Sequence, residues 1–168
     1  MIKFQFPESF WLIAEQIGHG RNVMNQENNK VNIRFDRGKK NKKVDTLGIL
    51  GELIAMHYLT EKKTKFEVAN LLDFKSSKNA DFIIRGKRVD VKTRKHNLAF
   101  ENDSYLLVNE EAHRKGLNKI DYYWFIYIVD KTIAEFYFFD YEKINEWKVK
   151  NMKYTNAFFI KREELKTI

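Results

Sequence analysis

Apolar side chains recur along the chain at the spacings of short helices and strands. Residues 7–17 place apolar side chains at helical spacing, and Pro7 suits a first helical turn. Residues 46–60 predict a second helix, with Asp45 or Thr46 as its N-cap. Apolar side chains cover every side of this second helix, so we expect it to be buried.

The second helix has two features that a buried helix would not need. Gly48 and Gly51 each cost about 1 kcal/mol of helix stability relative to Ala, so we expect another backbone to approach there. Glu52 is the only charged residue in the stretch 46–60. Because a buried carboxylate is costly without a cation nearby, Glu52 either pairs with Lys92 or an arginine, or belongs to a cation-binding site.

The rest of the chain is richer in β-type patterns than in helical ones. The predicted strands are 31–35, 66–72, 81–84, 88–93, 121–129 and 132–139. Two pairs of these form hairpins, with bends at Gly86 and at Asp130-Lys131. We expect the aromatic run 122–127 to be sheet core.

The connecting segments are less regular. Residues 37–43 predict a basic loop, and 104–108 are compatible with a strand or the start of a helix. Residues 109–115 look helical, with Gly116 as the stop. Asp140 is expected to cap a short helix that ends near Trp147, and 157–160 is a last apolar segment. The mixture predicts an α/β or α+β domain around one sheet.

Length and composition limit the class of protein. The 168 residues contain one proline, no cysteine and no Gly/Ser/Pro-rich linker, which predicts a single domain over residues 1–168. The absence of cysteine excludes disulfide scaffolds, cysteine nucleophiles and iron–sulfur sites. No apolar run reaches the roughly 18 residues of a membrane helix, and the N-terminus does not resemble a signal peptide. We therefore expect a soluble, cytoplasmic protein that does not enter membranes.

The charge balance favours a polyanionic partner. The chain carries 31 Lys and Arg against 23 Asp and Glu, a formal net charge of +8. Such a balance is typical of proteins that contact nucleic acid, although Lys- and Asn-rich chains also occur without such a partner. The histidines, His19, His57, His96 and His113, lack the spacing of a zinc or HNH site. We expect His57 to be a core residue, whereas His96 follows the first hairpin and could approach a substrate.

The first hairpin carries the residues with the clearest chemistry. Asp81 begins its first strand, and Asp90 and Lys92 lie two apart on its second strand, so they point to the same face. The residues Val89, Val91 and Thr93 point to the other face. Each of these features is ordinary alone. Together with Glu52 they supply what phosphodiester hydrolysis needs: carboxylates for a hard metal ion and a cation near the attacked phosphate.

This order of residues resembles the PD-(D/E)xK nuclease superfamily, which includes restriction endonucleases and Holliday junction resolvases. The matching segments are GILGELIAMHYL with Glu52, and NADFIIRGKRVDVKT with Asp81, Asp90 and Lys92. The resemblance covers about residues 45–95, and Ala80 stands where the family has a proline. It implies a restriction-endonuclease-like αβββαβ core over about residues 45–140, with a mixed central sheet flanked by helices and additions at both ends.

The resemblance also implies a role for each residue. Asp81, Asp90 and the backbone carbonyl of Val91 would bind Mg²⁺ or Mn²⁺, and Glu52 would join as a further metal or water ligand. Lys92 would orient or help deprotonate the attacking water, or stabilise the phosphate. Basic residues flank the hairpin, as contact with a phosphate backbone would require. They are Arg85, Lys87, Arg88, Arg94 and Lys95.

Three functional hypotheses follow. The first is a metal-dependent nuclease acting on DNA, and the second is a module of the same fold that binds nucleic acid without cutting it. The third is a basic α/β protein in which the charged strand face is simply solvated. An enzyme that cuts both strands commonly works as a dimer, so a homodimer is possible, although no segment of the sequence identifies an interface.

Overall fold

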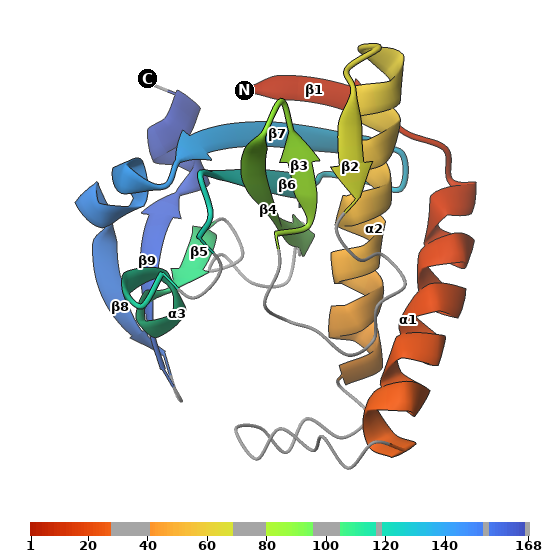
Figure 1. Ribbon diagram of the computed structural model, residues 1–168, viewed down its shortest axis with the longest axis horizontal. Coiled ribbons are helices and arrows are strands. Elements are labelled where there is room, and N and C mark those ends of the chain that lie inside the picture. Colours follow the sequence, from red (N-terminus) through yellow and green to blue (C-terminus); the bar gives the residue numbers. More distant parts are fainter. Residues whose placement is uncertain (28–40, 69–79, 96–104, 117–118, 153–154, 167–168) are drawn as a thin grey trace.

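The computed structural model describes residues 1–27, 41–68, 80–95, 105–116, 119–152 and 155–166 (Figure 1). It is a mixed α/β fold with a curled sheet of mixed orientation flanked by helices. The central sheet has the order β1-β7-β6-β4-β3-β2, and a smaller sheet has the order β5-β9-β8, so the prediction of a domain around one sheet is wrong in this respect. None of the helices in the described ranges combines the length and apolar character needed to cross a membrane.

The elements have the following bounds. The central strands are β1 (Ile2–Gln5), β2 (Phe66–Val68), β3 (Phe82–Ile84), β4 (Lys87–Lys95), β6 (Tyr122–Ile128) and β7 (Ile133–Asp140). The smaller sheet consists of β5 (Tyr105–Asn109), β8 (Lys148–Met152) and β9 (Thr155–Lys161). The helices are α1 (Ser9–Glu27), α2 (Asn41–Glu61), α3 (Glu110–Arg114) and the 3₁₀ helices η3 (Glu142–Glu146) and η4 (Arg162–Lys166).

Both predicted hairpins are confirmed. Strands β3 and β4 pair in antiparallel register, and the turn between them has positive φ at Arg85 (52°) and Gly86 (76°). Positive φ at both central residues belongs to the tight turn that matches the twist of a hairpin, and it explains the glycine. Strands β6 and β7 are also antiparallel, and Asp130 Oδ1 in their turn accepts the backbone N–H of Thr132 and of Ile133.

The central sheet has a separate core on each face. Helices α1 and α2 cover one face, where Ile49, Ile54 and Phe136 are fully buried (Figure 1). The smaller sheet and η3 cover the other face, where Phe125 and Phe158 are buried. Alternate side chains of the aromatic run 122–127 enter the two cores, which confirms its prediction as sheet core.

The start of α2 differs from its prediction. The helix begins at Asn41, so residues 41–43 are helical rather than part of a loop, and Asp45 and Thr46 lie inside the helix instead of capping it. Packing against α1 accounts for the difference. A Cβ added at Gly18 of α1 would lie 2.9 Å from the backbone nitrogen of Thr46, so glycine permits a close helix contact there. This contact lies at the predicted N-terminus of α2. Packing there stabilises one more turn of helix before it.

The shorter segments agree with the predictions except at one cap. Residues 105–109 form β5, Asn109 Oδ1 caps α3 by accepting the Ala112 N–H, and Gly116 ends the helix with a φ of 54°. Residues 157–160 lie within β9. Asp140 does not cap η3, because it pairs with Tyr122 as the last residue of β7. The predicted strand 31–35, residues 69–72 of the third predicted strand, and His96 lie outside the described residues.

Candidate functional site

The position of Asp81 is fixed by the β3–β4 hairpin. Its backbone N–H donates to the Val89 carbonyl at 2.9 Å, and its Oδ2 accepts the Val91 N–H at 2.6 Å. The last paired residues of the two strands are Phe82 and Val89. Asp81 therefore extends the hydrogen bonding between β3 and β4 by one residue beyond the last pair, with its side chain as the acceptor, and it lies beside Asp90.

Side chains of β4 alternate between the two faces of the sheet as predicted. Val89 is buried beneath α2, and Val91 packs against the same core. Asp90 and Lys92 line a cavity of about 60 Å³ on the other face, together with Tyr123 of β6. Asp90 is only 6% exposed and forms an ion pair with Lys92 through Oδ2 and Nζ. The predicted shared face of Asp90 and Lys92 is thus confirmed.

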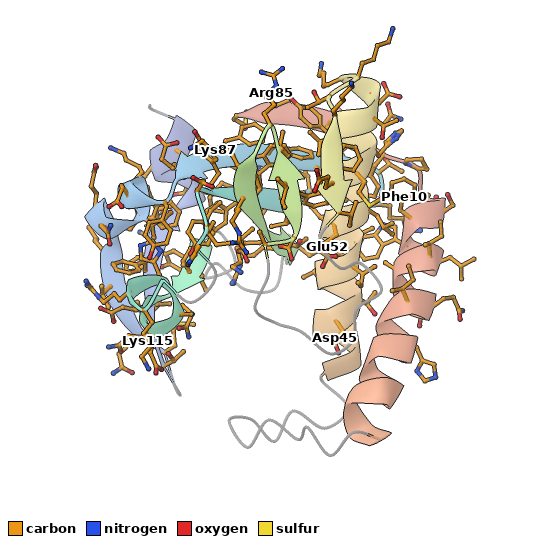
Figure 2. The ribbon with its side chains drawn as sticks, in the orientation of Figure 1. Phe10, Asp45, Glu52, Arg85, Lys87 and Lys115 are labelled. Carbon is orange, nitrogen blue, oxygen red and sulfur yellow. The ribbon has the colours of Figure 1, made fainter. Side chains whose placement is uncertain are left out.

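Helix α2 approaches β4 at Gly51. A methyl group added at Gly51 would overlap Thr93 Oγ1 and lie 2.9 Å from Thr93 Cβ. The close approach expected at the two helix glycines therefore occurs at Gly51, although a side chain makes it rather than a backbone. At Gly48 no described atom lies within 4 Å of such a methyl group. The Gly51 contact places the next residue, Glu52, beside the open end of the hairpin (Figure 2).

The four charged residues predicted as a site influence one another electrostatically. Burial, with the negative charges of Asp90 and Glu52, raises the pKa of Asp81 to about 8, although the Val91 N–H and Lys92 act in the opposite direction. Burial alone would lower the pKa of Lys92, but Asp90 first, and then Asp81 and Glu52, raise it above its usual value. The structure thus brings Glu52, Asp81, Asp90 and Lys92, which we name the hairpin cluster, into one electrostatic environment.

The donors of the hairpin cluster suit a hard cation. Within the described ranges, no three His, Asp or Glu side chains stand as a ready metal-binding group. Mg²⁺ commonly takes only one or two carboxylates, with water and substrate phosphate completing its ligands. Asp81 and Asp90 are adjacent carboxylates, and burial first, and then the negative charge of Asp90, raise the pKa of Asp81. These two oxygen donors therefore fit Mg²⁺ or Mn²⁺.

The predicted nucleic-acid contacts lie at two ends of the hairpin. Arg85 and Lys87 are exposed at its tip, away from Glu52 (Figure 2). Arg94 and Lys95 lie at the other end of β4, which is about 25 Å long at roughly 3.3 Å per residue. The basic residues of the hairpin therefore do not form one patch.

Several of these basic residues have partners within the protein. Lys87 Nζ lies 3.3 Å from Asp121 Oδ1, and the backbone N–H of Arg88 donates to Asp121 Oδ2 at 2.8 Å. The Lys95 ammonium lies 4.6 Å from the centroid of the Trp11 ring. These contacts position the strand end and the hairpin tip, and they leave the exposed Arg85 as the outermost cation of the turn.

A buried histidine behind the cavity was missed by the sequence analysis. His113 of α3 is 1% exposed, and its Nδ1 lies 3.2 Å from the Tyr123 hydroxyl. Its Nε2 lies 3.2 Å from Asn145 Oδ1, and its ring stacks on that of Tyr141. No spacing along the chain could reveal this network, because its members come from α3, β6 and η3 and the segment after β7.

Comparison with known proteins identifies no relative: no family model, no curated protein and no solved structure matches the chain.

Proposed function

We propose that the protein is a metal-dependent nuclease that hydrolyses phosphodiester bonds, most readily those of DNA. The observation that carries the proposal is the convergence of Glu52, Asp81, Asp90 and Lys92 from a helix and a hairpin into one electrostatically coupled cluster. Buried titratable groups with strongly perturbed pKa values beside a cavity are typical of functional sites.

The order of the elements supports membership of the PD-(D/E)xK superfamily. Helix α2 is followed by the antiparallel strands β2, β3 and β4, then by α3, and then by β6, which pairs in parallel with β4. This is an αβββαβ order with Asp90 and Lys92 on its third strand. The chain departs from the simplest form of that core because β5 precedes a very short α3.

Each member of the cluster has a distinct proposed role. Asp81 and Asp90 would hold Mg²⁺ or Mn²⁺, which when bound supplies positive charge at the phosphate and lowers the pKa of a coordinated water. The Val91 carbonyl and Glu52 are proposed as further ligands. Asp81, with a pKa raised to about 8 chiefly by burial, would carry a proton at neutral pH in the metal-free protein and lose it to solvent when a cation binds. Lys92 would leave Asp90 to contact the water or the phosphate.

A DNA-binding module without cleavage is the second candidate. The observation that favours it is that two cluster residues already have partners within the protein, because Lys92 pairs with Asp90 and Asp81 accepts the Val91 N–H. In either case Arg85, Lys87, Arg88, Arg94 and Lys95 are proposed as phosphate contacts. Two ends of one hairpin about 25 Å apart would then meet separate parts of an extended polyanion.

The test is incubation of the protein with supercoiled plasmid, branched DNA and RNA, each with and without Mn²⁺. We expect products that require the metal and that disappear in Asp90→Ala and Lys92→Ala at unchanged far-UV circular dichroism. The control variants Glu163→Ala and Lys131→Ala change exposed residues outside the cluster and should cut like the parent.

Two results would count against the proposal. Equal cutting by the parent, Asp90→Ala and Lys92→Ala would show that the assigned roles are wrong. Salt-sensitive binding to the same nucleic acids with no product under any metal would instead support the binding module.

A further inference from the structure

A phenol stands next to the buried carboxylate of the hairpin cluster. Tyr123 and Asp90 are register partners on adjacent parallel strands, and both line the same cavity. A tyrosine phenol is neutral near pH 7 and carries one hydrogen that it can donate. A phenol close to a carboxylate can donate that hydrogen to it in a charge-assisted hydrogen bond.

The hydrogen-bond network behind the cavity fixes the direction of that hydrogen. Glu142 is a carboxylate and only accepts, so the Asn145 amide presents Nδ2 to it, at 3.1 Å. Asn145 Oδ1 therefore faces His113 Nε2, which must carry a hydrogen. Burial lowers the pKa of His113, so the ring is neutral near pH 7 and its Nδ1 is an acceptor. It follows that Tyr123 donates to His113.

The ring of His113 is also held in place. Its centroid lies 4.0 Å from that of Tyr141, and the two rings are close to parallel. The Tyr141 hydroxyl donates to the backbone carbonyl of His113. Because both ring nitrogens and one ring face have partners, His113 is restricted to one orientation toward Tyr123.

We propose that His113 is a positioning residue that draws the Tyr123 hydrogen away from Asp90 and keeps that carboxylate available to a cation. The proposal rests on the proposed function only for the identity of that cation, which is the divalent metal. Without His113, Tyr123 would donate to Asp90, and a metal would have to displace that hydrogen bond before binding. In a variant without the Tyr123 hydroxyl, substitution of His113 would no longer change the affinity for the metal.

The test compares Mn²⁺ affinity, measured by electron paramagnetic resonance of the free ion, in single and double variants. We expect His113→Leu to weaken Mn²⁺ binding about tenfold or more. In this variant the metal would have to displace a hydrogen bond from Tyr123 to the charged Asp90 carboxylate. Tyr123→Phe should bind within about twofold of the parent, and Tyr123→Phe combined with His113→Leu should bind like Tyr123→Phe. His113→Asn places an acceptor near the position of Nδ1 and should restore binding.

The outcomes separate a positioning role from a structural one. Equal loss in His113→Leu and in the double variant, or no loss in either, would overturn the proposal. If His113→Leu does not fold, ¹⁵N NMR of histidine-labelled parent protein provides the second test. A hydrogen on Nε2 and none on Nδ1 is expected, and the opposite tautomer would overturn the proposal. If the parent binds no Mn²⁺, the proposed function fails, whereas the NMR result still decides the direction of the hydrogen.

Discussion

The contact between α2 and β4 is expected to depend on the missing side chain of Gly51. A methyl group there would overlap Thr93 Oγ1 and lie 2.9 Å from Thr93 Cβ and 3.0 Å from Thr93 Cγ2. Alanine in place of a helix glycine should stabilise by about 1 kcal/mol, but overpacking of a buried contact typically costs about 1–3 kcal/mol. Because all three Thr93 side-chain atoms are too close, we expect Gly51→Ala to lower the free energy of unfolding by about 1–2 kcal/mol.

Urea denaturation at 25 °C measures this change, and Gly48→Ala is the matched control. At Gly48 no described atom lies within 4 Å of an added methyl group, so the same substitution should stabilise by up to about 1 kcal/mol. Thr93→Ala should relieve most of the loss in the double variant. It removes no hydrogen bond, since the buried Thr93 Oγ1 has no hydrogen-bond partner in the described part of the chain.

The contact at Gly51 also links the stability of the fold to the site. Displacement of α2 from β4 would carry Glu52 away from Asp81 and Lys92, so cleavage by Gly51→Ala should fall while that of Gly48→Ala should not. Equal stability of Gly51→Ala and Gly48→Ala, or no recovery when Thr93→Ala is added to Gly51→Ala, would refute the role of this contact.

Two further predictions concern the stability that charged groups contribute. The folded-state pKa of Asp81, about 8, is above its ordinary value of 3.8, so the folded protein holds the extra proton between these values and loses stability as pH rises through this range. In EDTA, the free energy of unfolding of Asp81→Asn should therefore rise relative to that of the parent between pH 5 and 8, by at most about 1.4 kcal/mol per pH unit. A difference between the two proteins that does not change with pH would contradict the raised pKa of Asp81. Glu135 is 2% exposed and pairs with Arg162, so Arg162→Ala should lower the free energy of unfolding by about 3–5 kcal/mol. Lys143→Ala, which breaks an exposed pair with Glu146 on η3, should cost about 0.5 kcal/mol or less, and equal losses in Arg162→Ala and Lys143→Ala would contradict the role of burial.

The elements that the sequence predicted well are those whose signals are local. The β3–β4 hairpin combines alternating side chains with Gly86 at a turn that needs positive φ, and the β6–β7 hairpin has Asp130 to accept the turn amides. The start of α2 depends instead on its contact with Gly18, which lies in another helix. The cap predicted at Asp140 failed for a similar reason, because pairing with Tyr122 extends β7.

The same distinction holds for the site. Glu52 could be singled out because one carboxylate in an apolar helix needs a partner, and Asp90 and Lys92 because alternation places them on one face. The structure adds that these residues lie close enough to shift the pKa values of Asp81 and Lys92. His113 could not be found, because its role depends on hydrogen bonds between separate elements and on the direction of each.

The most direct test of the account is a crystal structure of the protein soaked with Mn²⁺, with anomalous diffraction used to locate the ion. The account predicts one or two anomalous peaks within coordination distance of the Asp81 and Asp90 carboxylates, with the Lys92 ammonium displaced from Asp90. A map at saturating Mn²⁺ with no peak at these carboxylates, and with the Lys92–Asp90 ion pair intact, would contradict it.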